Sequence, residues 1–434
     1  MALELIKEAD NLGSAFSAFL DTRAANEPAW LRLRREQSFA HFENIGLPTV
    51  KDEDWKYTNV APIAKESFVP TPGETVRPVD LPYAETREST LGFVNGYFSE
   101  GHSSLQALSS VRIVPFAGAL TSPEFEPIIR QHYERKKDQD GFTALNTAFS
   151  EGVLIVIPAG TKIEAPIHLA FLTTGEGTAS FGRVLIVAEP NSTATVVESY
   201  SGDGKYLTNG VIDLLVNDGA HLQHYKIQRE SADAFHIADT SADLGASANY
   251  DTTTINFGAA ISRHGIDVRM DHEGAQCSVD GLYMVDGNQH ADTHSLIDHR
   301  QPRCASHQLY KGILDGKSRA VFNGKVFVRH GAQQTDAKQT NKNLLLSPEA
   351  RVDTKPQLEI FADDVKCAHG AAVGQLDHDE LFYLESRGIN SSLARNMLTY
   401  GFAEEVIEKI KIESIKRELD EAVLHRLHSE LELQ

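Results

Sequence analysis

The sequence predicts a mainly β protein whose core is a parallel β-helix, with helical regions on both sides of it. Three observations predict this fold: apolar residues at helical spacing near both ends, β-branched and aliphatic runs between residues 151 and 375, and a turn that recurs among those runs. We therefore divide the chain into a mostly helical region with a few short strands at 1–150, a β-helix core at 151–375 and a C-terminal helical region at 376–434.

The N-terminal region is predicted to begin with two helices. Apolar residues recur at helical spacing through residues 2–45, and Gly46, Leu47 and Pro48 end the second helix. Five prolines between residues 62 and 82 predict an extended connector. Short strands are expected at 91–98 and 111–115, followed by a helix at 125–147.

The core is predicted from its runs and from a turn made of Gly or Asn followed by a small residue. The turn occurs at Asn191-Ser192, Gly219-Ala220, Gly245-Ala246, Gly274-Ala275, Gly331-Ala332 and Gly370-Ala371. Its first two intervals are 28 and 26 residues with no helix inside, which suits a coil of strands stacked on its neighbours. The pairs Asn209-Gly210, Asp280-Gly281 and Asn323-Gly324 are typical of hairpins and leave an antiparallel sandwich or barrel open as the alternative.

The C-terminal region is predicted to end in one helix from Glu404 to Leu431 with an apolar stripe. Such a stripe must pack on something. One interpretation is that it caps the end of the β-stack, which solenoids need for solubility, and the other is that it docks a partner protein. The two can coexist.

Composition limits the possible partners. The formal net charge of −20 argues against a nucleic-acid backbone or an anionic membrane, since both need a basic face. No window approaches the roughly 20 apolar residues that cross a bilayer, and no signal peptide is visible. We expect a cytoplasmic protein whose three cysteines, Cys277, Cys304 and Cys367, are reduced.

Two polar constellations are candidates for chemistry. His290, Asp292 and His294 would share one face of a strand, where they suit either a metal or, as the favoured interpretation, a hydrogen-bonded ladder. Cys367 and His369 would also share one side of a strand and could approach one iron or hold a sulfide. The familiar catalytic signatures are absent, and residues 312–318 are one residue too short for a phosphate loop, so ATP hydrolysis by this chain is not expected.

Several stretches resemble the SufB/SufD family of iron-sulfur cluster assembly proteins. They lie at 289–294, 311–319, 339–347, 353–370 and 381–389, with Ala394-Arg395, Gly401-Phe402-Ala403 and the early Asp54-Trp55-Lys56-Tyr57-Thr58 in addition. Most of them fall in the last third of the chain. The Cys-x-His-Gly ending at 367–370 resembles the SufD branch, because SufB usually carries Glu-His-Glu at the corresponding place.

The resemblance implies a right-handed parallel β-helix, a heterodimer formed with a SufB-like subunit through the β-helices, and a SufC-like ATPase on the C-terminal helices. It implies a non-enzymatic scaffold with a transient iron-sulfur cluster or iron at the SufB interface, and leaves open a flavin on the complex and a homodimer when the SufB-like subunit is absent. Candidate ligands are His369, the stronger, and Cys367, with His290, Asp292 and His294 as weaker ones. The candidates for partner binding are Phe382, Tyr383, Arg387, Arg395 and Phe402.

Two other functions remain open at this point. A β-helix enzyme acting on acidic polysaccharide would use Asp286, Asp292 and Asp298 as acid, base or calcium ligands. A purely structural subunit would use neither Cys367 nor His369 for chemistry.

Overall fold

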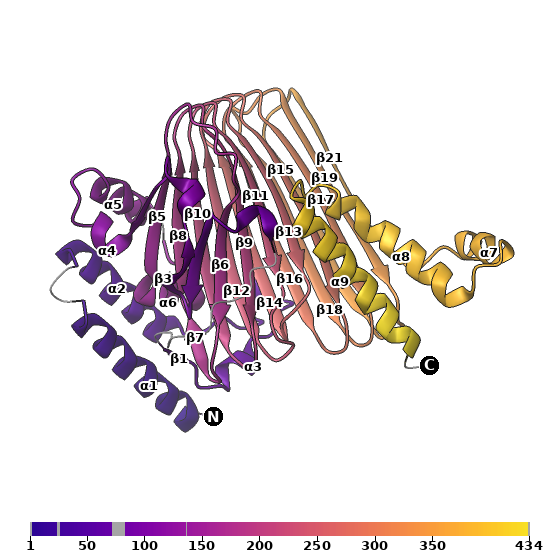
Figure 1. Cartoon of the computed structure of the whole chain (residues 1–434), viewed down its shortest axis with the longest axis horizontal. Helices are drawn as coiled ribbons and strands as arrows, with labels where there is room; N and C mark the ends of the chain where they lie inside the picture. The colour runs from indigo at the N-terminus through magenta and orange to yellow at the C-terminus, as the bar shows by residue number, and fades with distance from the viewer. Residues whose placement is uncertain (1, 24–26, 72–82, 136, 433–434) are drawn as a thin grey trace.

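A computed structural model describes residues 2–23, 27–71, 83–135 and 137–432. Strands make up 43% and helices 26%, and the core is a parallel β-solenoid of about eight turns between helical ends, so the predicted fold class is confirmed (Figure 1). Among the described residues, no helix combines the length and apolar character needed to span a bilayer.

The coils of the solenoid contribute alternate strands to two sheets, here called sheet A and sheet B. Sheet A has the order β20 (Arg351–Ile360), β18 (Arg319–Val328), β16 (His290–His299), β14 (Ile261–Met270), β12 (Phe235–Leu244), β10 (Leu207–Val216), β8 (Gly182–Ala188), β5 (Glu151–Ile157) and β4 (Arg112–Pro115), with β1 (Val69–Pro70) and β7 (Thr178–Ser180) beside it. Sheet B has the order β21 (Val365–Gly374), β19 (Thr335–Leu345), β17 (Ala305–Leu314), β15 (Gln276–Val285), β13 (Asn249–Asn256), β11 (His221–Gln228), β9 (Thr193–Gly202), β6 (Ile167–Thr173), β2 (Thr90–Val94) and β3 (Tyr97–Ser104).

Register in the stack repeats with the predicted period. His221 of β11 pairs with Thr193 on one side and Asn249 on the other, an offset of 28 residues in each direction, and all three strands are parallel. Inward-facing aliphatic and aromatic side chains of successive coils form one continuous core, which runs along the whole stack. Burial of these side chains on both faces of each strand is what makes a parallel stack stable.

The antiparallel alternative is wrong for the core, because the three hairpin-like pairs lie inside parallel strands. Gly281 of β15 pairs with Tyr310 of β17, and a Cβ atom on Gly281 would come within 2.1 Å of that ring. Glycine is present there to make room for an aromatic ring rather than to turn the chain. A true Asn-Gly hairpin occurs earlier, where Asn95 and Gly96 join β2 to β3 with φ of 52° and 87°.

Most of the predicted turns connect a strand of sheet A to the next strand of sheet B. Asn191, Gly219 and Gly274 have φ of 59°, 66° and 74°, the left-handed region that such tight corners need. The turn predicted at Gly370 is wrong, since Gly370 lies inside β21.

Helices of the N-terminal region cover the outer face of sheet A. They are α1 (Ala2–Asp21), α2 (Ala29–Ile45), α3 (Ala61–Ala64), α4 (Phe116–Ala119), α5 (Glu126–Arg135) and α6 (Gly141–Phe149). The two predicted N-terminal helices are present, but the helix expected at 125–147 is broken into α5 and α6, because Asp140 and Thr143 form a capping box at the start of α6. Of the connector prolines, Pro62 lies in α3 and Pro70 in β1, while Pro72, Pro78 and Pro82 lie outside the described residues.

The first end of the stack is closed by antiparallel pairing. β3 folds back on β2 at the edge of sheet B, and β4 runs antiparallel to β5 at the edge of sheet A. These short strands turn both sheet edges away from further parallel pairing.

Three helices follow the stack: α7 (His378–Ser386), α8 (Ser391–Ile407) and α9 (Glu413–Glu432). The single helix predicted from Glu404 is wrong, because α8 ends at Ile407 and α9 begins only at Glu413. The apolar stripe packs on the outer face of sheet B, in one cluster with Tyr225, Ile255 and Met284 (Figure 1). The expectation that it caps the end of the stack is therefore also wrong.

Candidate functional site

The last coil of the stack, formed by β20 and β21, leaves one edge of each sheet without a strand. Within the described part of the chain, β20 pairs with β18 alone and β21 with β19 alone. Side chains from Ala368 to the end of β21 are exposed, and Ile360 and Phe361 are exposed beside them. Such an edge offers unpaired N–H and C=O groups to another strand.

Cys367 and His369 lie in this coil and face its interior. Cys367 pairs with Ala337 and packs against the inward-facing core, and His369 pairs with the buried Gln339. Residues two apart in a strand project to the same side, so the predicted common face is present. Burial raises the pKa of the Cys367 thiol, and the nearby Asp336 adds to this, which outweighs the modest effect expected of Lys366.

The interior behind His369 is polar rather than apolar. Gln339 donates to the Gln308 side chain at 2.7 Å, and Gln308 donates to Ser295 Oγ at 2.8 Å in the coil beneath. Beside this chain, Thr354 donates to Asn341 Oδ1 at 2.8 Å. Hydrogen bonds of this kind satisfy polar groups that would otherwise be costly to bury.

A charged network lies deeper in the same interior, and the sequence analysis missed it. Glu198 lies 2.8 Å from His224 Nε2 and 3.5 Å from Lys226 Nζ, and accepts a 2.6 Å hydrogen bond from Tyr200. Burial alone would raise the pKa of Glu198, but Lys226 and His224 hold it well below its usual range. The available signal was polar residues at every second position in apolar strands, as in His224, Lys226 and Gln228.

A second buried carboxylate continues this network. Glu230 accepts hydrogen bonds from Thr208 at 2.6 Å and Gln228 at 2.9 Å, and His236 Nδ1 lies 2.7 Å away. Burial lowers the pKa of His236, although Glu230 opposes that shift. The imidazole is therefore a neutral hydrogen-bonding group at neutral pH.

His290, Asp292 and His294 share the outer face of β16, as predicted. Asp292 accepts hydrogen bonds from Thr58 at 2.5 Å and from Arg263, and His294 Nε2 lies 3.2 Å from its other oxygen. Burial would raise the pKa of Asp292, but Arg263 and His294 lower it, so the carboxylate is ionised and already neutralised. These contacts favour the interpretation as a hydrogen-bonded ladder.

Two further carboxylates of the polysaccharide hypothesis do not form a site with Asp292. Asp298, on the same strand, is held by Arg300 and Arg329 at 2.7 and 2.9 Å, and Asp286 is exposed in the turn before β16. In the regions that the structure describes, no three His, Cys, Asp or Glu side chains are arranged to hold a metal ion.

The residues predicted to bind partners divide into two groups. Phe382 and Tyr383 of α7 are 71% and 57% exposed, and α7, with Arg387 just after it, extends beyond the solenoid (Figure 1). Arg395 of α8 is also exposed. Phe402 is half-buried instead, with Lys311 Nζ 4.4 Å from its ring centre, so it contributes to the seat of α8 on sheet B.

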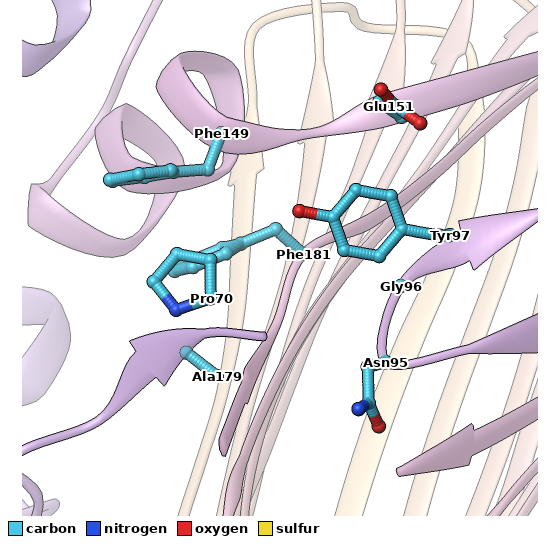
Figure 2. A pocket seen from close by; sticks show the side chains of 8 residues that line it. All are labelled: Pro70, Asn95, Gly96, Tyr97, Phe149, Glu151, Ala179 and Phe181. Atoms are coloured by element: carbon cyan, nitrogen blue, oxygen red, sulfur yellow. The ribbon is translucent and has the colours of Figure 1, made fainter. Parts of the chain in front are cut away.

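A crevice near the first coils is no candidate site. Its lining brings Tyr97 and Glu151 together with Phe149, Phe181 and Pro70, and Figure 2 shows the Tyr97 hydroxyl pointing into the gap beside these rings. The space is too narrow for a water-sized molecule. It is a packing gap between strands and α6.

Two family models match this chain. The model described as "SufBD protein N-terminal region" matches residues 7–169, and the model described as "SUF system FeS cluster assembly, SufBD core domain" matches residues 171–402, more than half of the chain. The chain belongs to the SufBD family. The core match of this SufBD protein includes the last coil, α7 and most of α8, but not α9.

Relatives of this SufBD protein support the same assignment. It is 35% identical over 397 residues to an iron-sulfur cluster assembly SufBD family protein of Synechocystis, covering 88% of this chain and 87% of the relative. It is 33% identical over 409 residues to the iron-sulfur cluster assembly protein SufD of Escherichia coli, covering 91% and 93%. The SufD of Bacillus subtilis is 27% identical over 412 residues, again covering 91% and 93%. Membership of this family leaves the polysaccharide hypothesis without support.

Proposed function

We propose that this chain is a non-catalytic, cytoplasmic scaffold subunit of the SUF iron-sulfur cluster assembly machinery. It pairs with a SufB-like subunit at the last coil and carries a SufC-like ATPase on its C-terminal helices. The observation that supports this most is the uncovered last coil, which presents Cys367 and His369 between two unpaired sheet edges.

Strand pairing supplies the joint. A partner strand added to β21 satisfies its free N–H and C=O groups and brings partner side chains over His369. Iron or a nascent cluster is the substrate held there, with one imidazole and one thiol from this chain and the other ligands from the SufB-like subunit. Imidazole is a weaker ligand for cluster iron than thiolate, so a mixed set suits a cluster that must leave.

The ATPase is proposed to bind at α7, where Phe382 and Tyr383 form an exposed aromatic pair. From there α8 leads back to sheet B, where Lys311 donates to the Phe402 carbonyl at 2.8 Å and pairs with Glu405. A nucleotide-driven movement of the ATPase would pass through α8 to strands β15 and β17, which pack against it. The work of ATP hydrolysis would thus reach the stack close to the last coil.

The test is co-expression with a SufB-like and a SufC-like protein, followed by anaerobic reconstitution of wild type and His369→Ala. Absorption and Mössbauer spectra report the cluster, and the same absorption spectra reveal any flavin. We expect the variant to assemble normally but to lose most of the cluster. His272→Ala is the matched control, because this exposed histidine lies in the turn before β15, away from the last coil.

Three results would count against the proposal. Equal cluster yield in His369→Ala and wild type would remove the ligand role and leave cluster chemistry to the partner. Equal losses in the His272→Ala control would indicate a general loss of folding. Failure of the wild-type chains to form any complex would contradict the scaffold assignment itself.

A further inference from the structure

A groove of about 230 Å³ lies on the outer face of sheet B and is used by nothing described so far. Its floor is formed by β15, β17 and β19, and the end of α8 with the linker after it forms one wall. Lys338, Thr340 and Lys342 follow one another at every second position of β19, so all three side chains face the groove. His307 of β17 lies beside Lys338 in register.

Both carboxylates of the groove are already neutralised. Asp280 accepts from Lys409 Nζ at 2.7 Å, from the Leu309 N–H at 2.9 Å and from Ser278 at 2.8 Å. Glu405 is paired with Lys311, which holds the pKa of Glu405 below its usual range.

Lys338 and Lys342 make no ion pair within the described residues, and both are exposed. The groove therefore has an excess of two positive charges on a chain whose net charge is −20. A local excess of this kind attracts small anions, because the surrounding acidic surface does not reach into the groove.

The groove is open on the side of the last coil. In register, Lys338, Thr340 and Lys342 lie beside Ala368, Gly370 and Ala372 of β21. None of these small side chains reaches over the lysines, and a Cβ on Gly370 would meet nothing within 4 Å. A ligand can therefore enter from this side without a change in the strands.

We propose that the groove binds a small anion with two phosphoryl groups. The two lysines are about 13 Å apart along the strand at their Cα atoms, from the usual rise per residue, and their flexible side chains can contact one phosphoryl group each. The Thr340 hydroxyl between them is a neutral donor for a bridging oxygen. The volume is below that of a pocket for a drug-sized molecule, which suits a compact, highly charged group.

The test is isothermal titration calorimetry on the full-length chain at low salt, with inorganic diphosphate as the probe. Lys338→Gln combined with Lys342→Gln is expected to weaken binding at least about tenfold, since each charge-assisted contact contributes substantially. The matched control is Lys162→Gln with Lys325→Gln, which removes the same charge at two exposed sites outside the groove.

Further titrations distinguish the sources of the anion. Monophosphate should bind more weakly than diphosphate, because it can engage only one lysine well. If ADP binds as tightly as diphosphate, the groove reads the phosphoryl groups alone, and if ADP binds more tightly, a nucleotide is the better ligand; both outcomes support the proposal.

Other results would overturn the proposal. They are the absence of diphosphate binding at millimolar concentration, an equal loss in the control variant, or binding of an acidic peptide such as poly-glutamate with groove-dependent affinity when diphosphate does not bind. The isolated chain is used, so none of these results bears on pairing with a SufB-like subunit.

Discussion

Thr58 Oγ1 lies 2.5 Å from Asp292 Oδ2 and 2.9 Å from His290 Nε2, although 234 residues separate Thr58 from Asp292. This fully buried hydroxyl fastens the N-terminal segment to the outer face of sheet A. Nearby, the Arg263 guanidinium lies 3.9 Å from the centre of the Trp55 ring, and Lys355 of β20 pairs with Glu53 at 3.0 Å. The early family motif is thus a strap that runs from the middle of sheet A toward the last coil.

Thr58→Val removes the hydroxyl and keeps the shape of the side chain. We expect it to lower the free energy of unfolding by about 1–2 kcal/mol, because the buried Asp292 loses a hydrogen bond. Chemical denaturation followed by circular dichroism measures the loss. Thr58→Ser keeps the hydroxyl and should retain most of the stability; equal losses in both variants would show that packing of the methyl group is what matters.

The buried Glu198 and Lys226 should tolerate joint replacement better than single replacement. Lys226→Met leaves the Glu198 carboxylate without its cation, and we expect a loss of about 3–5 kcal/mol. The double variant Glu198→Gln with Lys226→Met removes both charges and should recover most of that loss. A double-mutant cycle in thermal denaturation tests this, and purely additive losses would contradict the coupling.

His299 predicts a pH dependence of stability. It is buried, its Nε2 lies 2.8 Å from Ser306 Oγ, and burial lowers its pKa to about 4. The unfolded chain takes up this proton near pH 6.5, so the unfolded state binds more protons between pH 6.5 and pH 4. Stability is therefore lost as the pH falls through this window, by up to about 3 kcal/mol from this residue.

The measurement for His299 is the urea midpoint at half-unit steps from pH 7.5 to pH 4. The curve of His299→Gln should be flatter than that of wild type in the same window. Parallel curves would mean that other buried groups, such as His236, dominate the dependence.

Cys367 should be the cysteine that alkylating reagents reach in the folded chain. Cys277 and Cys304 are 4% and 1% exposed, whereas Cys367 is half-buried at the open coil. Its raised pKa predicts slow reaction with iodoacetamide at neutral pH and faster reaction as the pH rises. Mass spectrometry after labelling identifies the site, and a SufB-like partner bound at the last coil should protect it.

Gly281 and Gly370 form a matched pair for the packing argument. Gly281→Ala places a methyl group against the Tyr310 ring, and we expect a loss of about 1–3 kcal/mol from overpacking. Gly370→Ala meets open space and should leave the stability of the isolated chain nearly unchanged. Comparable thermal shifts for the two variants would contradict this account.

Local patterns in the sequence were enough to predict the helical ends and the repeating strands. The helical spacing before Gly46 and the 28-residue spacing between Asn191 and Gly219 are properties of neighbouring residues and of one period, so they can be read without a structure. The common face of Cys367 and His369 follows from the alternation of a strand for the same reason.

What could not be predicted depends on residues a coil or more away. Whether an Asp-Gly pair turns the chain was decided by Tyr310, which lies 29 residues beyond Gly281 and needs its space. The charge network of Glu198 has the same character, because His224 and Lys226 reach it only after stacking. The gap between α8 and α9 exists where the chain follows the surface of sheet B, which a helical period alone does not show.

The two ends of the stack have different consequences for stoichiometry. The antiparallel strands β3 and β4 terminate the sheets at one end, so strand addition can proceed only at β20 and β21. Two copies that meet through their last coils each turn a terminated end outward, and the pair has no edge left for a third copy. A protein made of long parallel strands is thereby limited to a finite particle instead of propagating as a filament.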